Sequence, residues 1–226
     1  MTELWLVRHG ETEWSLSGRH TGRTDIPLTA HGRERARGLG KFLAGTQFAA
    51  VLCSPLRRAR ETCEIAGFGD VAVVDEGLQE WDYGVYEGRT SEEIQAEIPG
   101  WSVWKDAIVG GETVEQVGAR ADGVIARALA VAVCGPTSQN RDAHPGQQAV
   151  RGPRDVGYPT TGPETDDVVR VALFAHAHIL RILAARWIGL EARGGSLFML
   201  GTGSVSVLGW EKETRVVERW NRWFEE

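Results

Sequence analysis

The stretch LWLVRHG, residues 4–10, indicates the fold because it joins a strand to a polar site. Leu4 to Val7 form a short apolar run, which is typical of a buried strand. The run stops at Arg8, His9 and Gly10, so polar chemistry begins where the predicted strand ends. In parallel α/β sheets, such strand ends lie together along one edge, where binding sites form.

Strand-like segments recur along the rest of the chain, and helical patterns separate them. Further strands are predicted at residues 50–53, 71–74, 168–175, 197–200 and 204–210. Parallel strands need long crossover connections, and these are usually helices. The alternation therefore predicts an α/β fold, a three-layer α/β/α sandwich around a mostly parallel central sheet.

The predicted helices have recognisable starts. Thr29 is placed to cap a helix whose small or apolar residues recur at helical spacing, namely Ala36, Leu39, Gly40 and Leu43. Thr90 with Glu93, and Thr113 with Gln116, have the spacing of a capping box, and the second pair opens the longest predicted helix. Other helical stretches end near Gly67 and run through Trp187.

Length and composition favour one globular domain, which we expect to span residues 1–226. A chain of 226 residues with 42% hydrophobic and 25% charged residues can form a substantial core. The formal charge of −6 argues against nucleic acid or an anionic membrane as a partner. No apolar run reaches the roughly 18 residues of a membrane helix, and no signal-peptide layout begins the sequence, so we expect a cytoplasmic protein.

Two further features bear on the organisation of the chain. Residues 135–167 contain five of the eight prolines and five glycines without apolar periodicity, so we expect a disordered insertion with no functional group, His144 included. The cysteines are odd in number and lack C-x-x-C spacing, which favours buried thiols over disulfides or a zinc site; they are Cys53, Cys63 and Cys134.

Three predicted strands end in residues that can handle anions. Arg8 and His9 follow the first strand, the segment from Ser54 to Arg58 follows the second, and His176 follows the strand at 168–175. Taken singly, each of these residues is equally suited to an ordinary polar or surface role. Together at one sheet edge they predict a small cationic pocket, because guanidinium groups bind phosphate oxygens bidentately and a neutral imidazole can attack phosphorus.

The order of the motifs resembles that of the histidine phosphatase superfamily, which includes cofactor-dependent phosphoglycerate mutases, fructose-2,6-bisphosphatases and acid phosphatases. Six motifs follow in that family's order: LVRHGETEW, TGRTDIPLTAHGRERA, SPLRRARET, LQEWDYGVYEG, GGET and FAHAHILRIL. The resemblance implies a phosphoglycerate mutase-like fold, with His9 as the phosphorylated nucleophile and Glu80 as the proton donor. It also implies that the transferred phosphoryl group is bound by Arg8, Arg58 and His176.

The same resemblance implies the site's remaining residues and the type of reaction. Substrate contacts are expected from Ser15, Thr21, Gly22 and Ala177. No metal and no cofactor are expected, and the implied reaction is hydrolysis of a small phosphomonoester through a phosphohistidine. For the first step Glu80 must be protonated, so a pKa raised by the charge of the bound phosphate and by burial beside Trp81 would suit this role.

The stretch between Gly88 and Gly110 favours hydrolysis over mutase activity. It contains Arg89 as its only arginine and no tyrosine, whereas the mutases carry a longer lid there that is rich in both residue types. The remaining motifs resemble most a subgroup with a fungal sedoheptulose-1,7-bisphosphatase and mycobacterial acid phosphatases. We therefore expect a phosphatase for sugar phosphates or bisphosphates. A phosphoglycerate mutase and a weakly active phospho-ligand-binding protein are the alternatives, and a homo-oligomer is left open.

Some positions depart from the family or have two interpretations. Ser15 stands where many relatives have asparagine, and Ala177 stands where most have glycine, so its Cβ either crowds the phosphate or is tolerated. Four arginines have two interpretations, binding of a second phosphate or surface salt bridges: Arg19, Arg23, Arg57 and Arg60. Five aromatic residues also have two interpretations, framing the pocket mouth or packing in the core: Trp81, Tyr83, Tyr86, Trp101 and Trp104.

Overall fold

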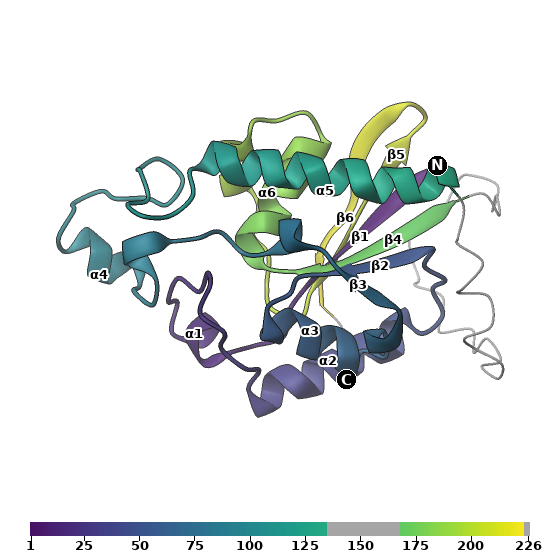
Figure 1. Cartoon of the computed structure of the whole chain (residues 1–226), viewed down its shortest axis with the longest axis horizontal. Helices are drawn as coiled ribbons and strands as arrows, with labels where there is room; N and C mark the ends of the chain where they lie inside the picture. Colours follow the sequence, from purple (N-terminus) through teal and green to yellow (C-terminus); the bar gives the residue numbers. More distant parts are fainter. Residues whose placement is uncertain (135–167, 224–226) are drawn as a thin grey trace.

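The computed structural model describes residues 1–134 and 168–223, with a six-stranded sheet in the order β3-β2-β4-β1-β5-β6 at its centre (Figure 1). The strands are β1 Thr2–Arg8, β2 Ala50–Cys53, β3 Ala72–Val74, β4 Val169–Ala175, β5 Val205–Glu211 and β6 Thr214–Arg222. The first four strands in chain order pair in parallel, whereas β5 is antiparallel to both β1 and β6. The prediction of a mostly parallel sheet is confirmed.

Helices cover both faces of the sheet (Figure 1). The helices α2 Ala30–Leu43 and α3 Arg57–Ile65 cover one face, and α5 Val114–Cys134 and α6 Ala177–Trp187 cover the other. Shorter α-helices are α1 Glu13–Leu16 and α4 Ser91–Gln95, and 3-10 turns span Gly69–Val71, Glu76–Leu78, Gly84–Tyr86 and Ala192–Leu197. This is the predicted three-layer α/β/α sandwich.

The first strand shows why the sheet sits between two helical layers. Leu4 and Leu6 are fully buried in the core on the α5 and α6 side, while Trp5 and Val7 pack in the core formed with α2 and α3. Successive side chains of a strand point to opposite faces, so an uninterrupted apolar run places apolar groups in both layers. The short run before Arg8 therefore anchors the functional end of β1 in the middle of the molecule.

The predicted helix caps are confirmed. The Thr29 hydroxyl accepts a hydrogen bond from the Gly32 amide at 2.9 Å, which starts α2. Thr90 and Glu93 form both hydrogen bonds of a capping box ahead of α4. Thr113 and Gln116 exchange the same pair of bonds before α5. Each pair satisfies amide donors that the first turn of a helix leaves without partners.

The C-terminal part of the fold differs from the sequence prediction. The expected strand at residues 197–200 is wrong: a 3-10 turn ends at Leu197, irregular chain follows, and the side chains of Leu197 and Met199 are 78% and 73% exposed. The strand β6 was not predicted, because its polar sequence lacks clear alternation and it lies at the edge of the sheet.

Three further expectations concern burial, the insertion and membranes. Cys53 and Cys63 are free and buried, as predicted. The insertion expected at residues 135–167 lies outside the described residues, as does the side chain of Cys134. Among the helices of the described chain, none combines the length and apolar character that spanning a membrane requires.

Candidate active site

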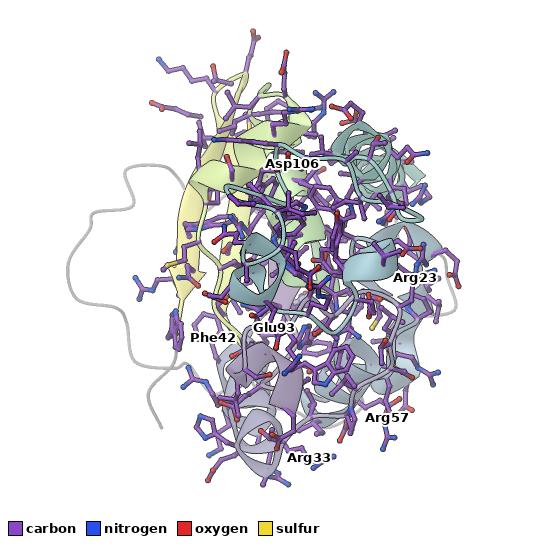
Figure 2. All side chains as sticks on the ribbon, turned by 90° about the vertical axis from the view of Figure 1, so that its left-hand side faces the viewer. Arg23, Arg33, Phe42, Arg57, Glu93 and Asp106 are labelled. Atoms are coloured by element: carbon purple, nitrogen blue, oxygen red, sulfur yellow. The ribbon has the colours of Figure 1, made fainter. Side chains whose placement is uncertain are left out.

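Parallel strand pairing brings the predicted cationic residues together at one end of the sheet, the end that faces the viewer in Figure 2. Arg8 pairs in register with Ala175, the residue before His176. The amide of His9 then donates to the Ala175 carbonyl at 3.0 Å. The rings of His9 and His176 lie 5.1 Å apart between centroids. Both histidines therefore occupy the carboxyl ends of neighbouring strands.

The His9 ring is held in one tautomer. Its Nδ1 lies 2.7 Å from the Gly10 carbonyl oxygen, and a carbonyl only accepts hydrogen bonds, so Nδ1 carries the proton and Nε2 carries a free lone pair. Burial, followed by the charges of Arg58 and Arg8, holds the pKa of His9 well below its usual value. The result is a neutral imidazole whose Nε2 can act as a nucleophile.

The glycine of the R-H-G motif is required by close backbone packing. A Cβ built on Gly10 would lie 2.5 Å from the Gly32 carbonyl oxygen at the start of α2. The Gly10 amide also donates to the Thr62 hydroxyl on α3 at 2.9 Å. These contacts fix the turn after β1, and with it the carbonyl that orients His9.

Arg58 is completely buried and is held by backbone carbonyls of the segment after α1. It donates to the carbonyls of Thr21, Gly22 and Thr24 at 2.9, 3.0 and 3.1 Å. Burial lowers the pKa of Arg58 from its usual value, and burial likewise lowers that of Arg8 to about 10, so both guanidinium groups keep their charge at neutral pH. The buried Arg58 and the half-buried Arg8 therefore flank His9 without a carboxylate salt bridge within the described chain.

Three buried nitrogen atoms around His9 lack hydrogen-bond partners among the described residues. They are Arg8 Nε, Arg58 Nε and His176 Nδ1. The other nitrogen of His176 lies 2.7 Å from the Ser54 hydroxyl, and Arg8 donates through Nη1 to the Leu200 carbonyl. Buried polar atoms in proteins are nearly always paired, so this set is suited to the oxygens of a bound anion.

Glu80 is buried at the N-terminus of α6. Its carboxylate accepts hydrogen bonds from the amides of Trp81, His178 and Ile179 at 2.9, 3.0 and 3.0 Å. Burial alone would raise the pKa of Glu80, but hydrogen bonding from His178 and the nearby His176 outweigh burial and hold the pKa well below its usual value. In the site without phosphate, burial therefore does not raise the pKa of Glu80, and the expected effect of the phosphate charge stays a prediction.

A cavity of about 380 Å³ opens onto this group. Its wall includes six of the predicted site residues, which are Arg8, His9, Ser15, Thr21, Glu80 and Ala177. Arg58, His176 and Gly22 are not part of the wall; the first two lie buried behind it. No group of three or more metal-ligating side chains occurs within the described chain.

The predicted substrate contacts differ in how the structure uses them. The Ser15 hydroxyl donates to the Thr12 carbonyl and accepts from the Thr12 amide, both at 2.9 Å, in the capping box of α1. The Gly22 amide donates to Glu87 at 2.8 Å, and its carbonyl holds Arg58. Ser15 therefore reaches a ligand only if it leaves the capping box, and Gly22 acts through Arg58.

Ala177 does not adopt a conformation that requires glycine. It is the first residue of α6, and the described non-glycine residues with positive φ are Lys212 and Asn221. The alternative that this position needs a left-handed backbone is thereby excluded for the observed conformation.

The rest of the cavity wall is mainly aromatic and uncharged. It includes Trp14, His20, Tyr83, Trp101, Trp104 and His178. Burial lowers the pKa of His20 to about 4 and also lowers that of His178, so both rings are neutral near pH 7. Of the five aromatic residues with two interpretations, Trp81 and Tyr86 pack in the core, whereas Tyr83, Trp101 and Trp104 both pack and face the cavity.

All four arginines considered for a second phosphate form surface ion pairs. The pairs are Arg19–Glu93, Arg23–Asp82, Arg57–Glu61 and Arg60–Glu64, at 3.3 to 3.9 Å. Arg23 and Arg57 lie near the periphery in Figure 2, and Arg19 alone of the four contributes to the cavity wall. Of the two interpretations, the structure therefore shows the salt bridges for these four arginines.

Ser54, which begins the predicted polar segment after the second strand, lies with its hydroxyl 2.7 Å from His176. A second polar pair was not predicted from the sequence: Tyr83 places its hydroxyl 2.7 Å from His178 Nδ1. The Tyr83–His178 pair joins a loop to a helix 95 residues later, and no local pattern indicates it.

Comparisons with known proteins agree with this geometry. Residues 4–132 and 161–222 match the histidine phosphatase superfamily (branch 1). The chain is similar to an acid phosphatase of Mycobacterium tuberculosis, with 36% identity over 214 residues that cover 94% of this chain and 88% of that protein. It is also similar to a sedoheptulose 1,7-bisphosphatase of Saccharomyces cerevisiae, with 34% identity over 209 residues that cover 82% of this chain and 67% of that protein.

A solved structure extends the comparison to the fold. The structure of an open reading frame from Mycobacterium tuberculosis matches with a TM-score of 0.79 and 32% identity, covering 98% of each chain. The family match spans both the sheet and the helices that carry the cationic residues. The chain therefore belongs to branch 1 of the histidine phosphatase superfamily and is a phosphatase of that family.

Proposed function

We propose that the protein hydrolyses small phosphomonoesters without a metal ion, through a phosphoryl group carried transiently on His9. The observation that carries this proposal is the set of unpartnered buried nitrogens, Arg8 Nε, Arg58 Nε and His176 Nδ1, around an imidazole whose Nε2 is free. A dianionic phosphoryl group satisfies all of them at once. The charge of the two arginines is then neutralised by the substrate itself.

In the first step, the Nε2 lone pair of His9 attacks phosphorus in line with the leaving oxygen. The N–P bond forms as the P–O bond to the alcohol breaks, and Glu80 gives its proton to the departing oxygen. Arg8, Arg58 and His176 stabilise the charge on the equatorial oxygens. The Gly10 carbonyl stabilises the positive charge that develops on the ring, because it keeps accepting the Nδ1 proton.

In the second step, water replaces the alcohol. Glu80, now ionised, takes a proton from water, whose oxygen attacks phosphorus as the N–P bond breaks. Inorganic phosphate leaves, His9 regains its lone pair, and Glu80 then releases its proton because its pKa is low in the empty site. The amides of Trp81, His178 and Ile179 stabilise the ionised carboxylate during the interval between the two steps.

The outer cavity favours monoesters of neutral sugars or polyols as substrates. Its aromatic rings offer apolar faces to sugar C–H groups, and its two outer histidines are uncharged. Arg19, the other arginine in this wall besides Arg8, is already bound to the Gly88 carbonyl and to Glu93. A second phosphate would have to break that ion pair, so we propose a preference for monophosphates over bisphosphates.

A substrate screen tests both the reaction and the preference. Purified protein is assayed for phosphate release from sugar monophosphates, sugar bisphosphates and 3-phosphoglycerate, with and without EDTA and 2,3-bisphosphoglycerate. We expect the highest kcat/KM for a sugar monophosphate, unchanged by either addition. Movement of phosphate between positions of glycerate that depends on 2,3-bisphosphoglycerate would instead indicate a mutase. Vanadate binding without turnover of any ester would indicate a phospho-ligand-binding protein.

A further inference from the structure

Arg120 on α5 is bound to the loop that carries Glu80, outside the cavity wall. Its Nη1 donates to the carbonyls of Gly77 and Gln79 at 2.8 and 3.0 Å, and its Nη2 donates to the Glu80 carbonyl at 3.3 Å. Nε and Nη2 also form a bidentate pair with Glu112 at 2.7 and 2.8 Å. A guanidinium group has five N–H donors, so every donor of Arg120 is used.

Glu112 extends this arrangement to the far side of Glu80. Its carboxylate also accepts from the Asp82 amide at 3.0 Å, and its own amide donates to the Asp82 carbonyl at 3.0 Å. Its carbonyl accepts from the indole nitrogen of Trp81 at 2.8 Å. The Arg120–Glu112 pair therefore holds the chain before, at and after Glu80.

The loop depends on this side-chain pair for its shape. After the 3-10 turn Glu76–Leu78, residues 79–82 belong to no regular element, so a helix or sheet ladder does not fix their carbonyls. The side chains of Arg120 and Glu112 are only 21% and 17% exposed, which limits competition from water. On the other side, the Glu80 carboxylate is bound by amides of α6. Glu80 is thus bound through its backbone carbonyl to α5 and through its carboxylate to α6.

We infer that Arg120 is a positioning residue for proton transfer, which sets where the Glu80 carboxyl group stands relative to the leaving oxygen. The inference rests on the proposed role of Glu80 as the acid. Proton transfer requires the donor within hydrogen-bond reach of the leaving oxygen, and a misplacement of about 1 Å costs on the order of a hundredfold in rate. Phosphate binding does not pass through this loop, because Arg58 and His176 are held by other segments.

The chain supplies a matched control on the same helix. Arg127 lies seven residues after Arg120 on α5 and forms a bidentate pair with Asp75 at 2.7 and 2.8 Å. Arg127 makes no contact with residues 79–82 among the interactions of the described chain. Replacing either arginine with lysine keeps the charge and removes the fork, because an ammonium group has three donors on one nitrogen.

The experiment compares Arg120→Lys, Arg127→Lys and Glu80→Gln on phenyl phosphate and p-nitrophenyl phosphate. The two esters are similar in size, but phenol, with a pKa of about 10 like tyrosine, needs a proton to leave far more than nitrophenol does. We expect Arg120→Lys to lower kcat on phenyl phosphate at least tenfold more than on p-nitrophenyl phosphate. Arg127→Lys should leave that ratio within twofold of the parent, and vanadate affinity should stay within threefold in both lysine variants.

The outcomes separate this inference from the proposed function. If Glu80→Gln changes the ratio and Arg120→Lys lowers both activities equally, the positioning role is overturned while the acid role stands. If Glu80→Gln leaves the ratio unchanged, the acid role itself fails. Glu112→Gln, which keeps the shape of the side chain and removes its charge, serves if Arg120→Lys does not fold. It should shift the ratio in the same direction, and an unchanged ratio there also overturns the inference.

Discussion

His9 and Glu80 are both buried, but opposite kinds of neighbours surround them. Burial, followed by the charges of Arg58 and Arg8, keeps the His9 ring neutral, which suits a nucleophile. Hydrogen bonding from His178 and the nearby His176 keep the Glu80 carboxylate ionised, which suits the base of the second step but not the acid of the first. A phosphoryl dianion bound beside Glu80 adds negative charge and raises the pKa of that carboxyl group. Substrate binding therefore favours the protonated form of Glu80 that the first step requires.

The pH dependence of kcat/KM tests this account of Glu80. Because the pKa of Glu80 in the free enzyme lies below its usual value, the proton for the first step must arrive with a substrate monoanion near neutral pH. The second pKa of a phosphomonoester is about 6, so kcat/KM should fall about tenfold per pH unit above about pH 6. Steady-state rates from pH 4.5 to 8.5 check this. A profile that stays level up to pH 8 would contradict it, and Glu80→Gln should remove the fall.

Ala177 occupies the position where most relatives have glycine, and the observed backbone tolerates a Cβ there. It begins α6 without positive φ, so Ala177→Gly gains no conformational freedom that the site needs. We expect kcat/KM to change less than about tenfold, equivalent to about 1.4 kcal/mol in the transition state. Assays with phosphate inhibition constants check this. A gain of about a hundredfold, with tighter phosphate binding, would show that the methyl group obstructs the site.

The sequence predicted the location of single site residues where that location depends only on their position at the end of a strand. Arg8, His9 and His176 follow buried strands, so their convergence was predictable from parallel pairing. The surroundings of Glu80 were not, because two of its amide partners and the His178 side chain come from α6, about a hundred positions later, and they outweigh the effect of burial on its pKa. The tautomer of His9 likewise depends on one carbonyl orientation.

The C-terminal hairpin supports the catalytic end of β1. Asn221 near the end of β6 has φ of 54°, and its Oδ1 accepts from the Gly201 amide at 2.8 Å. The neighbouring Leu200 carbonyl accepts from Arg8, and the Gly203 amide donates to the His9 carbonyl at 2.9 Å. The loop between η5 Ala192–Leu197 and β5 thus buttresses both residues, and β6 holds the loop. Local alternation could not reveal this, since the apolar residues of the loop form no strand and the sequence of β6 is largely polar.

Substitution of Asn221 tests whether the C-terminal hairpin supports Arg8 and His9. Asn221→Ala removes the bond to Gly201 and places alanine in a left-handed conformation that costs about 1–2 kcal/mol, so we expect lower stability and several-fold weaker vanadate binding. Asn221→Gly avoids the conformational cost but loses the same side-chain hydrogen bonds, those from Gly201 and Trp223, which makes it the matched control. Thermal unfolding and vanadate titration measure the two effects. Unchanged vanadate affinity in both variants would show that the hairpin does not influence Arg8.

Over the whole molecule, the candidate active site lies at one end of the sheet. The strand β4 begins at Val169, paired with Thr2, and ends beside His176. Seven residues of strand span about 20 Å, so Val169 lies far from the site. The family match also omits residues 133–160. Sequence reasoning was most reliable for the overall fold. Alternating strands and helices predicted it, because parallel strands joined by helical crossovers can be arranged in only a few topologies.

Removal of residues 138–160, with a short Gly/Ser linker in their place, should retain folding and activity. The free energy of loop closure changes only about 0.6 kcal/mol for each doubling of loop length, and the family match resumes at residue 161. We expect kcat/KM within threefold of the parent and a single cooperative unfolding transition. Loss of cooperativity would mean that the removed segment packs on the domain, and loss of activity alone would mean that it contributes to the site.

The most direct test of the mechanism is to trap the phosphorylated enzyme. Protein turning over ³²P-labelled p-nitrophenyl phosphate is denatured rapidly in alkali, in which phosphohistidine survives, and the labelled peptide is identified by mass spectrometry. The phosphoryl group should be found on His9, and His9→Ala should carry no label and lose almost all turnover, because the bond from His9 Nδ1 to a carbonyl leaves the lone pair of this imidazole on Nε2. Near-normal turnover by His9→Ala, or label on another residue during productive turnover, would contradict the mechanism.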